Sequence, residues 1–241
     1  LPDCATTLHN AAFYNCRKLK KLSVGTAISG IGSDEFMNDS QLEHLIIRGK
    51  DSEATGLPLI LERIAENITV SFCPNSSSSP ESIVFFPEYY EWLDEISPAH
   101  IFSRSIHGEG FRMRKSFENG ILNYRKYDSC LENALTVESP ESLCKIALNR
   151  LRWPSRLEDI FREKYENVIK KYMGTAFTLA VKDQDFPMLQ FICEHFSPDA
   201  SALASAIDQC IEKEWGEGNA FLIEAKHKSF SKKTFDFDLD F

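Results

Sequence analysis

Residues 175–199 read TAFTLAVKDQDFPMLQFICEHFSPD, and this stretch decides the fold class that the sequence predicts. Leu179 and Ala180 fall in a first short helical pattern. The apolar face of a second pattern, at helical spacing, is formed by Met188, Leu189, Phe191 and Ile192. Apolar residues three and four positions apart lie on one face of a helix. The stretch therefore predicts two short amphipathic helices in succession.

The same kind of pattern continues on both sides of this stretch. Residues 143–151, 156–173, 176–196 and 202–215 each carry helical periodicity, and residues 201–225 look like a further degenerate copy of the helix pair. Short helix pairs cannot bury their apolar faces alone, so successive pairs are expected to stack on one another. The predicted fold class is mainly α, built from short stacked helix pairs.

A family resemblance follows from two segments. Residues 6–15, TTLHNAAFYN, resemble the ankyrin-repeat opening T-P-L-H-x-A-A-x-x-G and depart from it at Thr7 and Asn15. Residues 175–199 resemble a whole ankyrin helix pair, with Asp199 near the closing Asp of the repeat. The resemblance implies divergent ankyrin-like repeats with an irregular, partly extended insertion, and a concave face that binds other proteins.

Five regions are expected along the chain. They are an N-terminal ankyrin-like helical region (1–72), a Ser/Pro linker or loop (73–80), an irregular aromatic and basic segment (81–128), a helical segment (129–173), and C-terminal repeats with an acidic Phe/Asp tail (174–241). Periodicity further predicts helices over residues 57–68 and 87–96. The tail, residues 235–241, alternates with period two and is expected to be an edge strand, an extended docking peptide or a frayed terminus.

Composition narrows the function classes. The formal net charge is −9, from 27 basic and 36 acidic side chains, which disfavours general nucleic-acid binding through phosphates. A local positive excess over residues 104–126 leaves open an anion site or a solvated surface. No apolar run is long enough to span a membrane, and seven widely spaced cysteines suggest free thiols, so a cytoplasmic location is expected, although the chain does not begin with Met.

A second resemblance lies in the helical segment 129–173. Residues 143–151, LCKIALNRL, are similar to the SOCS-box core L-C-R-x-x-I-R, and residues 153–157, WPSRL, are similar to its cullin-contacting L-P-x-x-L segment. Pro140 stands where the box has an upstream Leu, and the chain continues far beyond the usual end of such a box. The resemblance implies a helix that docks elongin B/C, with a cullin contact nearby. The partner-binding candidates are Leu143, Cys144, Ala147, Leu148, Leu151 and Pro154.

Two enzymatic alternatives remain open. Asp199, Glu224 and Lys226 follow a PD-D/E-x-K nuclease pattern, in which two carboxylates hold a divalent metal and the lysine activates water. A cysteine hydrolase would pair a thiol, Cys130 or Cys16, with a histidine base, His107 or His9. The chain could also be a microbial effector that uses ankyrin-like repeats for targeting.

The sequence thus predicts a binding protein without a cofactor or a bound metal. It is expected to be a protein–protein interaction module, and more specifically a substrate-recognition adaptor of a cullin-RING ubiquitin ligase, with the metal-dependent nuclease, the effector and the cysteine hydrolase as alternatives.

Overall fold

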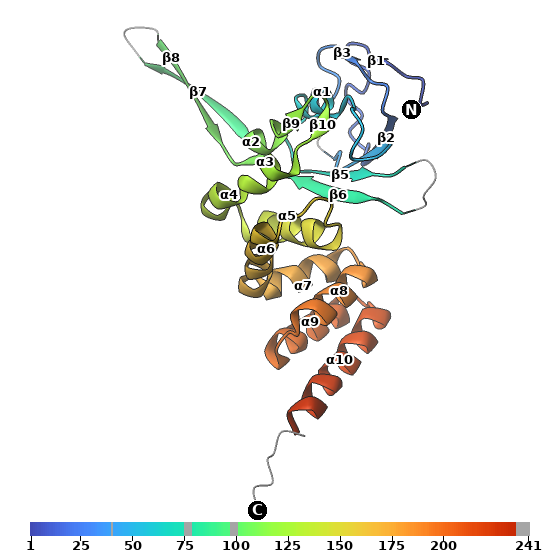
Figure 1. Ribbon diagram of the computed structural model, residues 1–241, viewed down its shortest axis with the longest axis vertical. Helices are drawn as coiled ribbons and strands as arrows, with labels where there is room; N and C mark the ends of the chain where they lie inside the picture. The colour runs from blue at the N-terminus through green and yellow to red at the C-terminus, as the bar shows by residue number, and fades with distance from the viewer. Residues whose placement is uncertain (40, 75–78, 97–100, 235–241) are drawn as a thin grey trace, which may run out of the picture. The chain divides into compact units, whose positions relative to one another are not determined.

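A computed structural model describes residues 1–39, 41–74, 79–96 and 101–234, with side chains left undescribed at residues 95–96, 101–102 and 229–234 (Figure 1). The chain divides into two compact units, Leu1–Arg162 (unit 1) and Glu163–Phe241 (unit 2). Helices hold 45% and strands 18% of the described residues. The prediction of a mainly α array of stacked helix pairs is therefore wrong, because unit 1 is built on β-sheets and the chain is mixed α/β.

Unit 1 begins with coils of chain that repeat every 23 residues. Strand β1 (Thr7–Leu8) pairs in parallel with β3 (Gly30–Ile31), and β2 (Lys21–Gly25) pairs in parallel with β4 (His44–Arg48). Thr7 lies opposite Gly30 and Lys21 opposite His44, and both offsets are 23 residues. Each coil therefore stacks on the next in constant register.

The sequence has the same 23-residue period, which the helical interpretation did not include. Leu8, Phe13, Leu19, Leu22 and Val24 recur 23 positions later as Ile31, Phe36, Leu42, Leu45 and Ile47. The rings of Phe13 and Phe36 stack with centroids 5.5 Å apart, and Asn38 Nδ2 donates to Asn15 Oδ1 at 2.9 Å. Like side chains thus meet in layers, which is how a coiled array of repeats buries its apolar residues.

The ankyrin-like helix expected over residues 6–15 is absent from this segment. It consists of β1 followed by turns, with Ala11 (φ 58°) and Asn15 (φ 62°) in the left-handed region, and their counterparts one repeat later, Asp34 and Asn38, share that conformation. A right-handed helix cannot pass through such residues. The Thr-x-Leu-His pattern of residues 6–9 therefore belongs to a strand and the turn after it.

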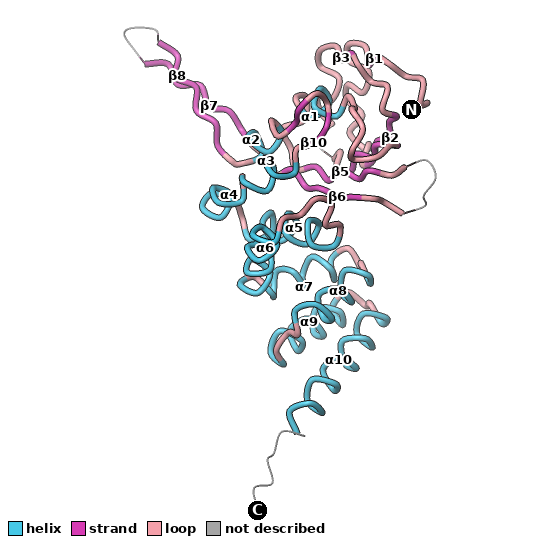
Figure 2. The backbone as a smooth tube through the Cα atoms, in the orientation of Figure 1, coloured by secondary structure: helices cyan, strands magenta, loops and turns pink. Residues whose placement is uncertain are grey.

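The coils continue into a four-stranded mixed sheet of order β2-β4-β5-β6 (Figure 2). Strand β5 (Ile68–Phe72) lies parallel to β4, and β6 (Ser82–Phe86) lies antiparallel to β5. Helix α1 (Leu57–Leu61) contacts β3, contributes three fully buried side chains and has Pro58 in its first turn. The helix expected over residues 57–68 therefore ends early, and Ile68 already belongs to a strand. Residues 75–78 of the expected Ser/Pro loop lie outside the described part of the chain.

The helix expected over residues 87–96 is a strand. Strand β7 (Tyr90–Ile96) pairs antiparallel with β8 (Ile101–His107). Tyr89, Trp92, Leu93 and Ile96 fit helical spacing, but the aromatic residues around them favour a strand once a partner strand is available. Figures 1 and 2 draw β7 and β8 as a two-stranded arm that extends from the rest of unit 1.

Short elements complete unit 1. They are α2 (Gly110–Arg114), the pair β9 (Phe117–Glu118) and β10 (Ile121–Leu122), and the helices α3 (Tyr124–Ser129), α4 (Leu131–Val137) and α5 (Pro140–Arg152). Helix α5 packs against β6. Helix α6 (Asp159–Lys171) crosses the boundary between the two units in sequence.

Unit 2 contains the helix pair predicted over residues 175–199 and a second pair from the copy expected over residues 201–225. Helix α7 (Met173–Lys182) packs on α8 (Phe186–Phe196), and α9 (Ala200–Glu212) packs on α10 (Gly216–Thr234). Helix α7 also packs on α9 and α8 on α10, so the pairs stack in order. Asp185 and Asp199 cap α8 and α9 by accepting from Met188 N and Ala202 N. The tail, residues 235–241, lies outside the described residues. Within those, no helix combines the length and the apolar character needed to cross a membrane.

The second coil of unit 1 buries carboxylates where the first coil has small side chains. Ala12 and Cys16 of the first coil correspond to Glu35 and Asp39 of the second. Both carboxylates are buried, and that of Glu35 has no hydrogen-bond partner among the described residues. Burial raises the pKa of Asp39. The folded state therefore favours the protonated form of Asp39 more than the unfolded chain does.

We expect the stability of the protein to depend on the ionisation of Asp39. Because the pKa of Asp39 is raised in the folded state, its carboxyl group destabilises the fold at pH values above that pKa and is without effect below about pH 3.8, where it is protonated in both states. The Asp39→Asn variant should exceed the wild type in unfolding free energy at pH 7, with the difference shrinking as the pH falls towards 4.

Urea unfolding of both proteins across this pH range measures the difference. Asp34→Asn is the matched control, since Asp34 is exposed and Asn tolerates its left-handed backbone. A pH-independent effect of Asp39→Asn, or one equal to that of Asp34→Asn, would contradict the assignment.

Candidate functional site

The side chains predicted to dock elongin B/C lie inside the protein. Helix α5 is capped by Ser139, whose Oγ accepts from Ser142 N at 3.1 Å, and has Pro140 in its first turn. The five candidates on α5 are at most 5% exposed: Leu143, Cys144, Ala147, Leu148 and Leu151. Pro154 follows the helix and is exposed. In this conformation the five helical side chains are packed in the core and are not presented to a partner.

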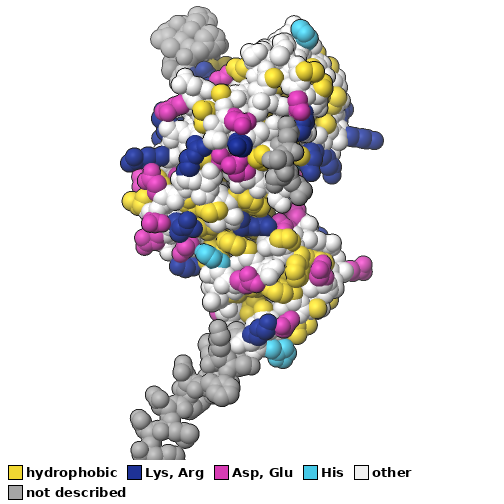
Figure 3. Space-filling view, turned by 45° about the vertical axis from the view of Figure 1, so that its right-hand side comes forward, with side chains coloured by type: hydrophobic (Ala, Val, Ile, Leu, Met, Phe, Trp, Pro, Cys, Tyr) yellow, Lys and Arg dark blue, Asp and Glu magenta, His cyan; other side chains and the backbone are white. Residues whose placement is uncertain are grey.

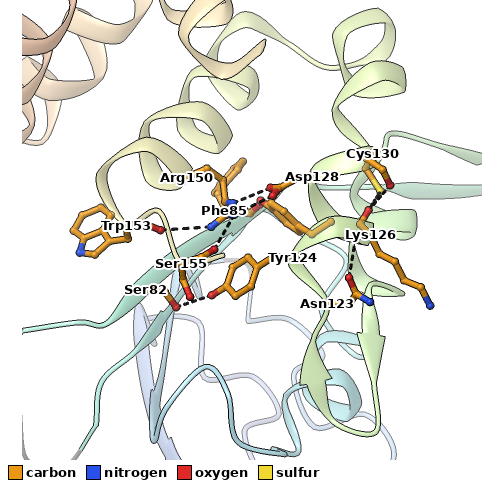
Figure 4. A network of polar contacts seen from close by, with 12 residues as sticks. Ser82, Phe85, Asn123, Tyr124, Lys126, Asp128, Cys130, Arg150, Trp153 and Ser155 are labelled. Carbon is orange, nitrogen blue, oxygen red and sulfur yellow. Dashed lines mark hydrogen bonds and ion pairs between the residues drawn. The ribbon is translucent and has the colours of Figure 1, made fainter. Parts of the chain in front are cut away.

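The C-terminal end of α5 is joined to α3 by a buried ion pair. Arg150 Nε and Nη2 lie 2.8 and 2.9 Å from the two carboxylate oxygens of Asp128, and both side chains are at most 1% exposed (Figure 4). Arg150 also donates to the carbonyl oxygens of Trp153 (3.4 Å) and Ser155 (3.0 Å). Its guanidinium lies 4.3 Å from the ring centre of Tyr124. The loop after α5 is thereby held against α3.

The hydroxyl of Tyr124 continues this network towards the sheet. It lies 2.7 Å from Asp51 Oδ2 and 2.8 Å from Ser82 Oγ, and Asp51 Oδ1 lies 3.4 Å from Arg156. Burial raises the pKa of Tyr124 well above its usual value, so the phenol stays protonated and donates to the carboxylate. These contacts join the loop after β4, strand β6, helix α3 and the loop after α5. The role of the Tyr124 network is therefore structural.

A cavity of about 480 Å³ opens beside Tyr124. It is lined by Glu118, Asn119, Ile121, Leu122, Asn123, Tyr124, Arg125, Arg156 and Glu158. Its charged residues are paired: Arg125 lies 3.6 Å from Glu158, and Lys126 next to the cavity lies 2.5 Å from Glu118. This hollow therefore offers mixed, mutually neutralised charge.

The basic segment 104–126 is neutralised in the same way. Five of its six basic side chains pair with a carboxylate: Arg104 with Glu91, Arg112 with Glu109, Lys115 with Glu62, Arg125 with Glu158, and Lys126 with Glu118. Figure 3 shows basic and acidic side chains interspersed over one face of the molecule. The segment is therefore a surface of ion pairs rather than a concentrated positive patch.

The sixth basic residue, Arg114, is buried and binds backbone. It is 3% exposed, and its guanidinium donates to the carbonyl oxygens of Ile64 (2.9 Å), Glu66 (2.6 Å), Pro87 (2.5 Å) and Gly110 (3.0 Å). We call these four bonds the Arg114 bridge. Burial lowers the pKa of Arg114 to about 10, which leaves it charged at neutral pH. Pro87 precedes β7 and Gly110 follows β8, so the bridge fastens both ends of the arm.

Further contacts hold the base of the arm to the turn after α1. Tyr89 N donates to Ala65 O at 3.0 Å, and Glu88 N donates to Asn67 Oδ1 at 3.0 Å. The Tyr89 ring meets Phe111 edge-on, with ring centres 5.4 Å apart. The base of the arm is therefore ordered by the body of unit 1.

The arm itself, which we define as strands β7 and β8 (residues 90–96 and 101–107), exposes large apolar side chains. The exposed fractions are 60% for Tyr90, 56% for Trp92, 65% for Leu93 and 38% for Ile106. Within the described residues, β7 and β8 pair with each other and with no third strand. This arm was missed at the sequence level because the same residues fit a helical period. A strand could have been predicted from the two aromatic residues, Tyr90 and Trp92, which alternate with Glu91 and Leu93.

The nuclease pattern is carried by helices. Asp199 caps α9, whereas Glu224 and Lys226 lie on α10, where Glu224 is exposed and pairs with Lys228 at 2.7 Å. Among the residues that the structure describes, no group of three or more His, Cys, Asp or Glu side chains is arranged to hold a metal ion. The strand hairpin that presents both carboxylates in such nucleases is not formed by these residues.

The cysteine–histidine pairings also lack the necessary chemistry. Burial raises the pKa of Cys130 to about 11, whereas a nucleophilic thiol needs a lowered pKa. Cys16 is exposed in a turn of the first coil. His107 lies on the arm, where it stacks on Tyr90, and His9 lies in the turn after β1. Within the described part of the chain, neither Cys130 nor Cys16 forms a hydrogen bond with His107 or His9.

Comparisons with known proteins leave the function to be argued from this geometry. No protein-family model matches the sequence, and neither does any curated protein or solved structure. The exposed arm and its fastened base are therefore the basis of the functional argument.

We expect Arg114→Lys to destabilise unit 1 by roughly 2–4 kcal/mol, because an ammonium cannot reach four carbonyl groups and leaves buried acceptors without donors. Urea unfolding measures the loss. Amide hydrogen exchange at Glu88 and Tyr89 should accelerate, since their bonds hold the base of the arm.

The matched control is Arg112→Lys, which changes an arginine two residues away whose side chain is 62% exposed. This variant should alter stability by less than about 0.5 kcal/mol. Equal effects of the two substitutions would refute the importance of the bridge.

The cysteines should differ in reactivity with iodoacetamide at about pH 8. Cys4 and Cys16 are exposed, whereas burial raises the pKa values of Cys130 to about 11 and of Cys144 to about 12. Peptide mass spectrometry of the folded protein should show alkylation of Cys4 and Cys16 first, and all seven cysteines should react in urea. Labelling of Cys130 as fast as that of Cys16 would show a reactive thiol at Cys130 and would support the cysteine hydrolase alternative.

Proposed function

We propose that this chain is a protein-binding module whose contact surface is the arm of β7 and β8. The observation that carries the proposal is the set of exposed side chains on the arm: Tyr90, Trp92, Leu93 and Ile106. Exposed apolar side chains gathered on one small element mark interaction sites. Trp and Tyr are also the residue types that dominate binding energy at protein interfaces.

The Arg114 bridge supports the proposal because it lowers the entropic cost of binding at the base of the arm. Residues on either side of the arm, Pro87 and Gly110, are bonded to one guanidinium. An element that is ordered before it meets its partner loses less conformational freedom on binding.

The open edges of the arm favour an extended partner. Each strand of a two-stranded sheet has one row of backbone N–H and C=O groups that faces away from its neighbour. A peptide that adds a third strand to such an edge gains backbone hydrogen bonds, and alternate side chains then select the sequence. This mode of binding needs no cleft.

Adaptor activity towards elongin B/C and a cullin stays a prediction of the sequence. Its five side chains on α5 are buried, and none of them belongs to the arm. The proposed surface is independent of that prediction, and the two are tested by different variants.

A random peptide library displayed on phage tests the proposal with the full chain as bait. We expect peptides that bind the wild type and bind the Trp92→Ser/Leu93→Ser variant at least tenfold more weakly, because central aromatic and apolar contacts each contribute about 2 kcal/mol or more. Affinity is measured by titrating the enriched peptides.

Val137→Ser/Ile211→Ser is the control, since Val137 and Ile211 are 52% and 58% exposed and belong to neither strand of the arm. Both double variants should keep the wild-type urea midpoint, because all four side chains are exposed. Enriched peptides that bind all three proteins equally, or no enrichment on the wild type, would contradict the proposal.

A further inference from the structure

The arm has two faces of different chemistry. Side chains alternate along a strand, and directly paired residues share a face. Register pairs Tyr90 with His107, Trp92 with Ser105 and Asp94 with Ser103. We call these six residues the aromatic face. The other face carries Glu91, Leu93, Arg104 and Ile106.

The aromatic face places exposed π surface beside a carboxylate. Tyr90 stacks on His107 with ring centres 4.9 Å apart and an angle of 14° between the rings. Ser105 Oγ lies 3.3 Å from His107 Nε2. Trp92 Nε1 donates to Asp94 Oδ1 at 2.5 Å, which holds the carboxylate against the edge of the indole. More than half of Tyr90 and of Trp92 remains exposed.

On the opposite face, the charged side chains that the structure describes pair with each other. Glu91 forms an ion pair with Arg104 across the two strands, and the pKa of Arg104 is raised by its hydrogen bond to Glu91. Leu93 and Ile106 are the apolar side chains described on that face. The aromatic face is therefore the face that attracts a charged partner, because the carboxylate of Asp94 accepts a hydrogen bond there from the neutral indole of Trp92.

Building on the function proposed above, we infer that the aromatic face binds an extended basic segment of a partner protein. Lys or Arg side chains lie over Trp92 and Tyr90, and a cationic head group meets Asp94. Cations bind the faces of aromatic rings, and a charged hydrogen bond to a carboxylate adds to this attraction. Residues two apart on a strand are about 6.6–6.8 Å apart. Alternate basic side chains of the segment thus match the spacing of Tyr90 and Trp92.

Charge argues against other occupants. A second copy of this chain would bring Asp94 and a net charge of −9 against the same charges. Phosphates of a nucleic acid or of an anionic membrane are repelled in the same way. A basic, extended polypeptide is the partner that complements both the carboxylate and the rings.

Two synthetic heptapeptides test the inference by fluorescence anisotropy with the full chain. One is acetyl-Thr-Lys-Val-Lys-Thr-Lys-Val-amide, and the other carries Glu in place of each Lys; both are labelled with fluorescein. We expect the Lys peptide to bind at least about tenfold more tightly than the Glu peptide, and more weakly at about 300 mM NaCl than at about 50 mM.

Variants separate the carboxylate from the ring. Asp94→Asn should weaken binding of the Lys peptide about tenfold through loss of a charged contact. Trp92→Leu keeps an apolar side chain but removes the π face, and should weaken binding about threefold. Glu224→Gln is the control, because it removes one exposed negative charge far along the sequence from the arm. This variant should leave binding unchanged.

The inference is overturned if the two peptides bind equally, if the Lys peptide shows no binding up to about 1 mM, or if Asp94→Asn and Glu224→Gln behave alike. It is also overturned if the wild type binds phosphatidylcholine/phosphatidylserine vesicles, or self-associates in light scattering, and Trp92→Leu abolishes that behaviour. The aromatic face would then bind a membrane or a second copy of the chain. Panned peptides that depend on Trp92 and Leu93 but are not enriched in Lys or Arg overturn the basic segment while leaving the protein-binding function intact. Absence of any arm-dependent peptide overturns both.

Discussion

The guanidinium of Arg114 is the group on which the arrangement of unit 1 around the arm depends. It lies among four backbone carbonyl groups that come from the turn after α1 and from the two ends of the arm. A buried charge is tolerated only when its hydrogen-bonding groups are satisfied, and a planar arginine can satisfy several acceptors at once. Its guanidinium also lies 5.1 Å from the ring centre of Tyr89, next to the start of β7. One side chain thus converts three separate segments into a fixed base.

A second buried arginine organises the other side of the same unit. Arg150 pairs with Asp128, contacts the Tyr124 ring, and reaches the loop after α5. The N-terminal coils, by contrast, are held by layers of apolar side chains such as Phe13 and Phe36. The difference follows from regularity. Repeating coils bring like apolar residues together, whereas the short irregular elements from β9 to α5 leave polar groups that must be bonded specifically.

The fold could be predicted from the sequence where the pattern is local. The helices α7 and α8 arise from apolar spacing, from Asp185 as a cap and from nearby contacts, all of which lie within one stretch. Strand β7 was predicted as a helix because Tyr89, Trp92, Leu93 and Ile96 fit a helical period, and the deciding partner, β8, is supplied by later residues. The 23-residue repeat is present in the sequence, but the ankyrin-like pattern of residues 6–15 predicted a helix there instead of a strand and turns. The candidate residues on α5 were correctly recognised as one apolar helical face, yet burial against the rest of the protein depends on contacts that no local pattern contains.

The sequence by itself determined the acidic net charge, the stacked helix pairs of unit 2 and the apolar character of α5, because each depends on composition or on residues within a few turns. Tertiary structure alone decided that β7 and β8 form an exposed arm, that α5 is core, and that most of the basic segment is neutralised by carboxylates. The reason is distance along the chain. The ion pair of Lys115 with Glu62 and the bonds from Arg114 to Ile64 and Glu66 join residues about fifty positions apart. Such partners are selected only when the whole unit has folded around them.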